Sequence, residues 1–370
     1  MRTQPVANEL VRGLLGFIAH VSNAAEDGRR DAYREAFARL RPHLALYPQN
    51  APRPSTVFES AASTVRQVAT HCLPFATALV MHLYPLCALQ CVPIPLLSPA
   101  RLRRAMLLRA IRNHSLILAN AGSERSRGAE QMLTATLATD GLRISGTCDY
   151  MSLSSVADVV LLKASIDGGN DTALCAASLE GGSVRKGPWT FKGTLQLSDT
   201  SSVTFDRHRV PHGRYLVLRE AAGLQCVADY QRCWFHLFLA EAHIARLEEL
   251  HRMWSLPRST TFAVSRNETD RLREYSLHLL DAFECGGDVS ALMRTTSALK
   301  LRASLMAQDM VATLQAREVL AHGGRLATDV AELSCIRFQP TADARIVQSL
   351  GACPQVPRFS LSAQERLIVT

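Results

Sequence analysis

The sequence predicts an α+β protein that is mainly helical, and three observations point to this fold class. The 370 residues begin with helical periodicity, continue with one block of strand-like alternation, and then return to helical periodicity. A parallel βαβ fold alternates strands with helices, so strands gathered in one block exclude that class. The length exceeds what one small core needs and suits two or three compact units.

The first unit is predicted to be a helical domain over residues 1–130. Apolar residues recur at helical spacing in 8–45 and 58–92. Ser98 is a typical N-cap, and Pro99 follows at the first helical position, so a further helix is expected from here to about residue 111.

The apolar run over residues 78–97 is long enough to suggest a membrane span. His82 and three prolines, Pro85 among them, oppose that interpretation and favour a buried core helix followed by an extended loop. Glu9 and Arg12 interrupt any signal-peptide core. We therefore expect a cytoplasmic protein with no membrane contact.

The second unit is predicted over residues 131–218, where Thr, Val and Leu strands alternate with Gly, Asp and Ser. Asp140 and Gly141 stand between two alternating runs, which is a strong hairpin signal. Helical periodicity resumes over 219–335 and predicts a third, helical unit. Residues 336–370 have little periodicity and are expected to form a C-terminal tail.

Charge and cysteine content argue against nucleic-acid binding and against a metal site. The net charge is +8 and the pI about 9.1, but only four of the 41 basic residues are lysine. Such an arginine excess is more typical of genome composition than of a nucleic-acid surface, so nucleic acid is not an expected partner, although a functional basic face stays open. The ten cysteines are spread through apolar segments without a CxxC pair, so we expect core residues and no metal site.

Five strings, in this order, resemble the acyl-CoA dehydrogenase superfamily. That resemblance implies an N-terminal helical domain, a middle antiparallel β-barrel and a C-terminal four-helix bundle. It also implies a flavin cofactor, FAD or FMN, and a homodimer or homotetramer. The strings are HCLPFATALVMH (71–82), LANAGSERSRG (118–128), DGLRISGTCDYMSLSSVADVVLL (140–162), GTLQLSDTSSVTFDRHRVP (193–211) and LQAREVLAHGG (314–324).

The resemblance also implies which residues contact the flavin. By position, Tyr150 matches the aromatic residue that lies over the flavin, and Ser152 matches a nearby hydroxyl. Other candidates fall on the turn after the first strand, on the segment that reaches the partner subunit's cofactor, and on the Gly-Gly turn. They are Asn120, Gly122, Ser123, Arg258, Phe262, Gly323 and Gly324.

The dehydrogenases of this family need a carboxylate base, and this chain lacks it at both usual places. The first place falls in the tail, where Asp343 is the only acidic residue nearby, and the second falls near Arg232, where Asp229 is the nearest acid. Asp343 and Asp229 are therefore candidate substitutes. His82 is a third candidate, as a hydrogen-bond donor in a pocket that excludes water, or else as a structural helix-end histidine.

Three functions follow from these patterns. The first is an oxygen-using, flavin-dependent oxidoreductase that acts on a hydrophobic, carrier-tethered or CoA-tethered metabolite. The second is an acyl-thioester dehydrogenase with a displaced base. The third is a degenerate member without redox chemistry that binds an anion. The basic charge adds an acidic carrier protein to the candidate partners, beside a small-molecule or acyl-thioester substrate. Secondary metabolism is the expected setting of the first function.

Overall fold

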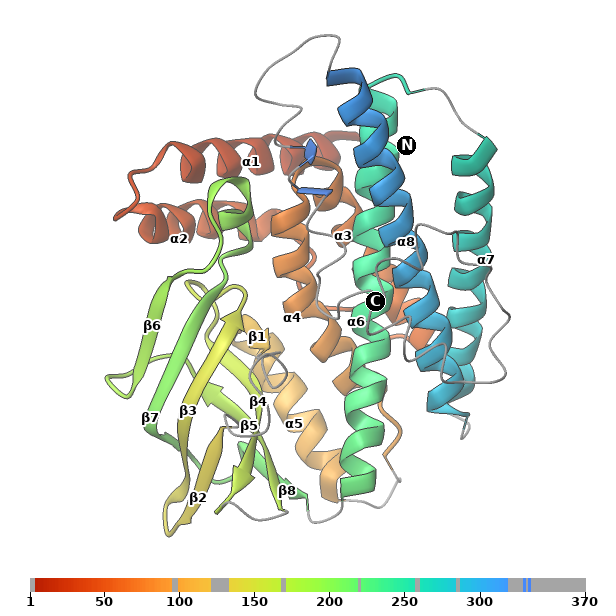
Figure 1. The fold of residues 1–370 in the computed structure, drawn as a ribbon. Helices are drawn as coiled ribbons and strands as arrows, with labels where there is room; N and C mark the ends of the chain where they lie inside the picture. Colours follow the sequence, from red (N-terminus) through yellow and green to blue (C-terminus); the bar gives the residue numbers. More distant parts are fainter. Residues whose placement is uncertain are drawn as a thin grey trace, which may run out of the picture.

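A computed structural model gives the fold of the chain (Figure 1). It describes residues 4–94, 99–120, 133–167, 171–218, 221–256, 260–283, 287–318, 329–330 and 332–333. The helices are α1 (Gln4–Asn23), α2 (Arg29–Leu40), α3 (Pro54–His71), α4 (Leu73–Cys91), α5 (Pro99–Asn113), α6 (Ala221–Met253), α7 (Thr260–Phe283) and α8 (Val289–Glu318), with short 3-10 helices η1 (Arg41–His43) and η3 (Gly193–Ser198).

The strands form one block between the two groups of helices, which confirms the predicted order of elements. They are β1 (Leu118–Asn120), β2 (Thr134–Ala138), β3 (Gly141–Met151), β4 (Val159–Ile166), β5 (Thr172–Ser178), β6 (Val184–Trp189), β7 (Ser201–Val210) and β8 (Tyr215–Leu218). The predicted division into domains at 1–130, 131–218, 219–335 and 336–370 remains a prediction.

The sheet corrects the expected antiparallel barrel. The strand order is β6-β7-β3-β2-β4-β5-β8, with β1 paired to β4, so the described strands form a curled open sheet that ends at β6 and β8. The sheet is mixed, since β4 pairs in parallel with both β1 and β2. Period-two alternation shows which residues share a face but carries no information about the direction of the neighbouring strand, so the parallel pairs could not be foreseen.

The predicted hairpin joins β2 to β3, but its two turn residues are Thr139 and Asp140, and Gly141 pairs with Ala138 as the first residue of β3. Its φ of +138° lies in a region that side chains rarely adopt. A Cβ atom at this position would lie 2.3 Å from the carbonyl oxygen of Val210 on β7. Glycine is therefore required both by the backbone conformation and by the close approach of a second strand.

The central helix of the structure is α6, which runs through the whole helical layer (Figure 1). It packs against α3 and α4 on one side and α8 on the other, and α7 packs against α8. Its apolar residues lie all around the helix, as expected for a helix with several packed faces. The helices α6, α7 and α8 fall in the segment where a four-helix bundle is predicted, and most of the chain after Glu318 lies outside the described residues, so the bundle stays a prediction.

The apolar helix α4 is a core helix, as predicted. Of the described helices it is the one long and apolar enough to cross a membrane, and 83% of its apolar 18-residue stretch is buried inside the protein. The six cysteines whose side chains the structure describes are also buried, which confirms them as core residues. Burial raises the pKa of the Cys175 and Cys233 thiols to about 12, so neither supplies a thiolate near neutral pH.

Candidate functional site

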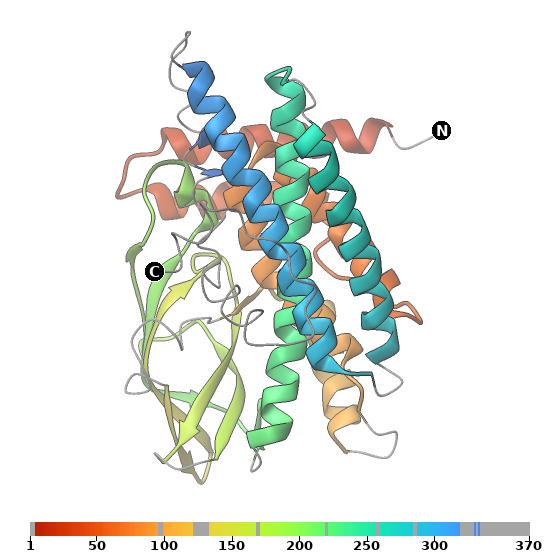
Figure 2. The same ribbon diagram turned by 45° about the vertical axis from the view of Figure 1, so that its right-hand side comes forward.

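Three of the predicted site residues lie at the strands that meet the helical layer: Tyr150 and Ser152 at the C-terminal end of β3, and His82 against β1. Figure 1 shows these two strand ends close together beside α4 and α6, and the rotated view in Figure 2 keeps the same arrangement of sheet and helices. The 3-10 helix η3, which precedes β7, also packs against α4. The candidate site therefore lies at the junction of sheet and helices.

Tyr150 presents an aromatic ring to solvent at this end of β3. Its side chain is 45% exposed, and its ring stacks on Phe191 with centroids 6.4 Å apart and planes 23° from parallel. Phe191 is itself 36% exposed. Two stacked rings with open surface form a flat apolar platform, which fits a planar aromatic ligand such as a flavin ring.

Ser152 lies two residues further on, in a buried chain of hydroxyl groups. Its Oγ is 2.9 Å from Oγ1 of Thr200, which in turn is 2.9 Å from Oγ of Ser198. All three side chains are buried. This chain ties the end of β3 to the turn before β7 and fixes the backbone that carries Tyr150.

The buried side chain of Asp199 stabilises the same turn by hydrogen bonds. Its carboxylate accepts hydrogen bonds from the Ser155 backbone N–H at 2.7 Å, the Ser155 hydroxyl at 2.6 Å and the Trp189 indole N–H at 2.8 Å. Burial raises its pKa, and these donors oppose the rise. Asp199 has a φ of +48°, so an otherwise unfavourable backbone conformation is maintained by these contacts.

His82 is fully buried between α4 and β1. Its Nε2 lies 2.8 Å from the Leu46 carbonyl oxygen, and its Nδ1 accepts the Leu118 backbone N–H at 2.9 Å. The Leu118 bond requires an unprotonated Nδ1, so the proton belongs on Nε2. Burial lowers the pKa of His82 to about 4, which keeps the ring neutral. Both nitrogens are engaged by backbone, which favours a positioning role over direct catalysis.

Asp158 fixes β1 from the other side. Its carboxylate accepts the Ile117 backbone N–H at 2.7 Å, and its own N–H donates to the Ile117 carbonyl at 2.9 Å. Together with His82, this reciprocal pair sets the position of β1 and the direction in which the chain reaches Asn120. The Asn120 backbone pairs with Leu161 on β4, and the Asn120 side chain is not among those that the structure describes.

Asp229, one of the two candidate substitutes for the missing base, lies on α6 and forms an ion pair. Its Oδ1 is 3.2 Å from Nη1 of Arg232, one turn along the same helix, and both side chains are about three-quarters buried. Close by, Tyr84 of α4 packs on Phe235 of α6 with centroids 4.8 Å apart. Asp229 is thus already paired, and the neighbouring contact between α4 and α6 is a buried aromatic one.

Phe262 lies at the start of α7 and stacks on His251 of α6, with centroids 4.8 Å apart. It therefore has a packing role within the chain, beside any contact with a partner subunit. The other predicted site residues lie outside the described residues. They are Gly122, Ser123, Arg258, Gly323, Gly324 and Asp343.

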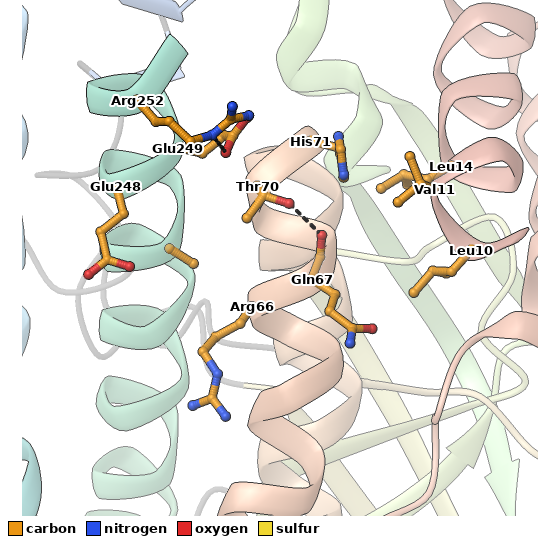
Figure 3. Close-up of a pocket in the computed structure, with 11 residues that line it drawn as sticks. Leu10, Val11, Leu14, Arg66, Gln67, Thr70, His71, Glu248, Glu249 and Arg252 are labelled. Carbon is orange, nitrogen blue, oxygen red and sulfur yellow. Dashed lines mark hydrogen bonds and ion pairs between the residues drawn. The ribbon is translucent and has the colours of Figure 1, made fainter. Parts of the chain in front are cut away.

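A separate pocket of about 420 Å³ opens between α1, α3 and α6, and no predicted site residue lines it (Figure 3). One wall is apolar, and the others carry charged groups that already have partners: Arg66 pairs with Glu241 at 2.7 Å and Arg252 with Glu249 at 2.6 Å. Within the described part of the chain, no group of three or more His, Cys, Asp or Glu side chains is placed to hold a metal ion.

Sequence reasoning missed Asp199, Asp158 and Phe191. Asp199 is part of one of the five quoted strings, but the donors that surround it come from segments 10 and 44 residues away. No local pattern indicates such a contact. The mixture of Ser, Asp and Thr around position 199 was the one available signal, since such residues form side-chain-to-backbone bonds at turns.

No family model matches this sequence, and no curated protein matches it. Solved structures do match. The dibenzothiophene monooxygenase TdsC from Paenibacillus sp. A11-2 is 16% identical, with a TM-score of 0.68, and the match covers 95% of this chain and 96% of TdsC. The chain has the acyl-CoA dehydrogenase fold.

Two further structures with this fold match over similar lengths. KijD3 is 19% identical with a TM-score of 0.65, and the match covers 95% of this chain and 97% of KijD3. FkbI, described as acting in the biosynthesis of a methoxymalonyl extender unit, is 14% identical with a TM-score of 0.67, covering 96% of this chain and all of FkbI. TdsC and KijD3 have both been solved with FMN bound.

Proposed function

We propose that this protein is a flavin-dependent, oxygen-using oxidoreductase that acts on a hydrophobic, carrier-tethered or CoA-tethered metabolite. The observation that carries the proposal is the exposed ring of Tyr150, stacked on Phe191 at the end of β3. A flat ligand needs such a surface, and the acyl-CoA dehydrogenase fold is the fold of the FMN-bound structures of TdsC and KijD3. FMN is thus the favoured flavin.

The residues of the chain would bind, orient and shield the flavin, which when bound supplies the electrons for the activation of oxygen. Tyr150 would stack on it, and the hydroxyl chain of Ser152 and Thr200 would keep that strand end in place. The Tyr84–Phe235 pair would form an apolar wall that excludes water from the reacting substrate. Because the Asp229 carboxylate is paired with Arg232, an oxygen-using reaction that needs no carbon-acid base fits these residues better than dehydrogenation.

The test begins with the visible spectrum of the purified protein and a titration with FMN and FAD. We expect FMN to bind and Tyr150→Ala to weaken binding at least tenfold, because the stacking surface is lost. Tyr275→Ala is the matched control, since Tyr275 on α7 is also half-exposed. Equal affinity of the Tyr150 and Tyr275 variants would remove Tyr150 from the site.

The same preparation distinguishes the reactions. Bleaching of bound flavin by an acyl thioester without oxygen would indicate a dehydrogenase. Flavin that is reduced only by an external reductase, with product formed on exposure to oxygen, supports the proposal. A colourless protein that binds neither flavin would indicate a role without redox chemistry.

A further inference from the structure

The helix α5 carries an outward-facing stripe of two apolar and two basic side chains, Arg101, Leu102, Met106 and Arg109, here called the α5 stripe. Leu102 and Met106 are 66% and 63% exposed, more than any other large hydrophobic side chain in the described residues. Both arginines are exposed, and within the described part of the chain neither has an ion pair or hydrogen bond. These side chains are therefore available to a partner.

Helical spacing places three members of the stripe on one face, and Arg101 lies at its edge, about 100° around the helix from Leu102. Leu102, Met106 and Arg109 are four and three residues apart, which brings them onto neighbouring turns of the same side. The opposite face already has its partner, because Ile111 is buried in a cluster with Leu118 and neighbouring strand residues. A surface helix needs one apolar face for its own protein, so the second apolar face has no role in the fold.

The helix is fixed to the body of the protein by two of its other arginines, Arg104 and Arg112. Arg112 donates to the side chains of Asn50 and Gln90, both at 2.8 Å, and to the Pro48 carbonyl at 3.1 Å. Arg104 donates to the carbonyl of Val92. The stripe is thus presented on a held helix, which reduces the entropy lost when a partner binds.

The charge around the stripe selects an acidic partner. The helix contains five arginines and no acidic residue, and no Asp or Glu stands anywhere between Glu59 and Glu124. Leu102 and Met106 also need an apolar cover, which phosphate groups do not offer. An interfacial membrane helix buries a whole apolar face, whereas here only these two side chains protrude. The complementary surface is an acidic protein with a small apolar hollow.

The position of α5 connects it to the candidate site. The helix lies beside the sheet and the lower end of α6 (Figure 1), and only four residues separate its end from β1, which His82 and Asp158 hold. A partner on the stripe would therefore lie near the strand that leads into the site. We propose that the α5 stripe docks an acidic carrier protein that presents the substrate as a thioester. This inference rests on the proposed function for its substrate but not for the docking itself.

The test is a binding titration of the full chain with fluorescently labelled holo acyl carrier protein at low and high salt. We expect binding at 50 mM NaCl that weakens at least tenfold at 500 mM. The variants Arg101→Glu/Arg109→Glu and Leu102→Ser/Met106→Ser should each weaken binding at least tenfold. The matched control is Arg12→Glu/Leu15→Ser, an exposed arginine and an exposed leucine on α1.

Phosphatidylglycerol vesicles and a DNA duplex are titrated in parallel. Carrier binding that both stripe variants weaken and the α1 control keeps supports the proposal. No carrier binding at low salt, equal affinity of the stripe and control variants, or stripe-dependent binding of vesicles or DNA alone would overturn it. Flavin titration of the same proteins separates the two proposals: flavin binding without carrier binding refutes docking alone, and the reverse refutes the flavin function alone.

Discussion

Replacement of His82 by glutamine should change how the stability of this protein depends on pH. Glutamine keeps one acceptor and one donor for the Leu118 N–H and the Leu46 carbonyl but cannot titrate. In the wild type, burial lowers the pKa of the folded imidazole to about 4, against an ordinary value near 6.5. The unfolded chain therefore takes up a proton between these two values while the folded chain does not.

The sign and size follow from this difference. His82 contributes stability that is fully present above pH 6.5 and is lost as the pH falls toward 4, because protons then favour the unfolded state. With about 1.4 kcal/mol for each unit of pKa, the loss is about 2 kcal/mol at pH 5 and about 3 kcal/mol at the acid limit.

The measurement is urea unfolding at pH 7.5 and pH 5, followed by tryptophan fluorescence. Because other groups also contribute to the dependence of stability on pH, the quantity compared is the loss in the wild type minus the loss in His82→Gln. We expect a difference of about 2 kcal/mol, and His114→Gln, which removes an exposed imidazole, should behave like the wild type. An equal loss in the wild type and His82→Gln would contradict a buried neutral imidazole.

Three further changes test other parts of the structure. Asp199→Asn places an amide N–H against the Ser155 and Trp189 donors, so it should lower the free energy of unfolding by about 3 kcal/mol in urea denaturation. A loss below about 0.5 kcal/mol would contradict the role of the Asp199 carboxylate in holding this turn. Gly141→Ala should cost at least about 2 kcal/mol in the same assay, because its Cβ meets a strand carbonyl at 2.3 Å, and a neutral result would show that the hairpin relaxes. Burial raises the pKa of Glu332 to about 7 despite its pairing with Arg246, so the contribution of this carboxyl to stability should fall by up to about 3 kcal/mol as pH rises from 4.5 through 7. The quantity to compare is the change in stability between pH 5 and pH 8 in the wild type minus the change in Glu332→Gln, measured by thermal unfolding, and equal changes would contradict the raised pKa.

Helices were the most predictable part of this fold. Apolar residues at helical spacing predicted α3, α4 and α6, since burial of one or more faces leaves a local pattern in the sequence. The hairpin at Gly141 was equally clear because its turn chemistry is local. The parallel pairing of β4 with β1 and β2 was not predictable, because it depends on which distant strand lies alongside.

The candidate site also has residues that the sequence could identify and residues that only the folded structure shows. Tyr150 and Ser152 were identified from the resemblance of residues 140–162 to a known family, and the structure places Tyr150 at the end of β3 and Ser152 directly after it. The structural part played by His82 was one of two open alternatives, and only the tertiary contacts to Leu46 and Leu118 distinguish them. Asp199 was missed since its role exists only when segments distant in sequence come together.

The length of α6 restricts how this chain can change during evolution. At 1.5 Å for each residue, its 33 residues span about 50 Å, and the part from Asp229 to the pocket residue Arg252 spans about 35 Å. An insertion of a single residue in its middle would rotate everything beyond it by about 100°. That rotation would misalign the contacts with α3, α4 and α8 at once. Variation in chain length is therefore expected in the connections between elements, while α6 keeps a constant number of residues.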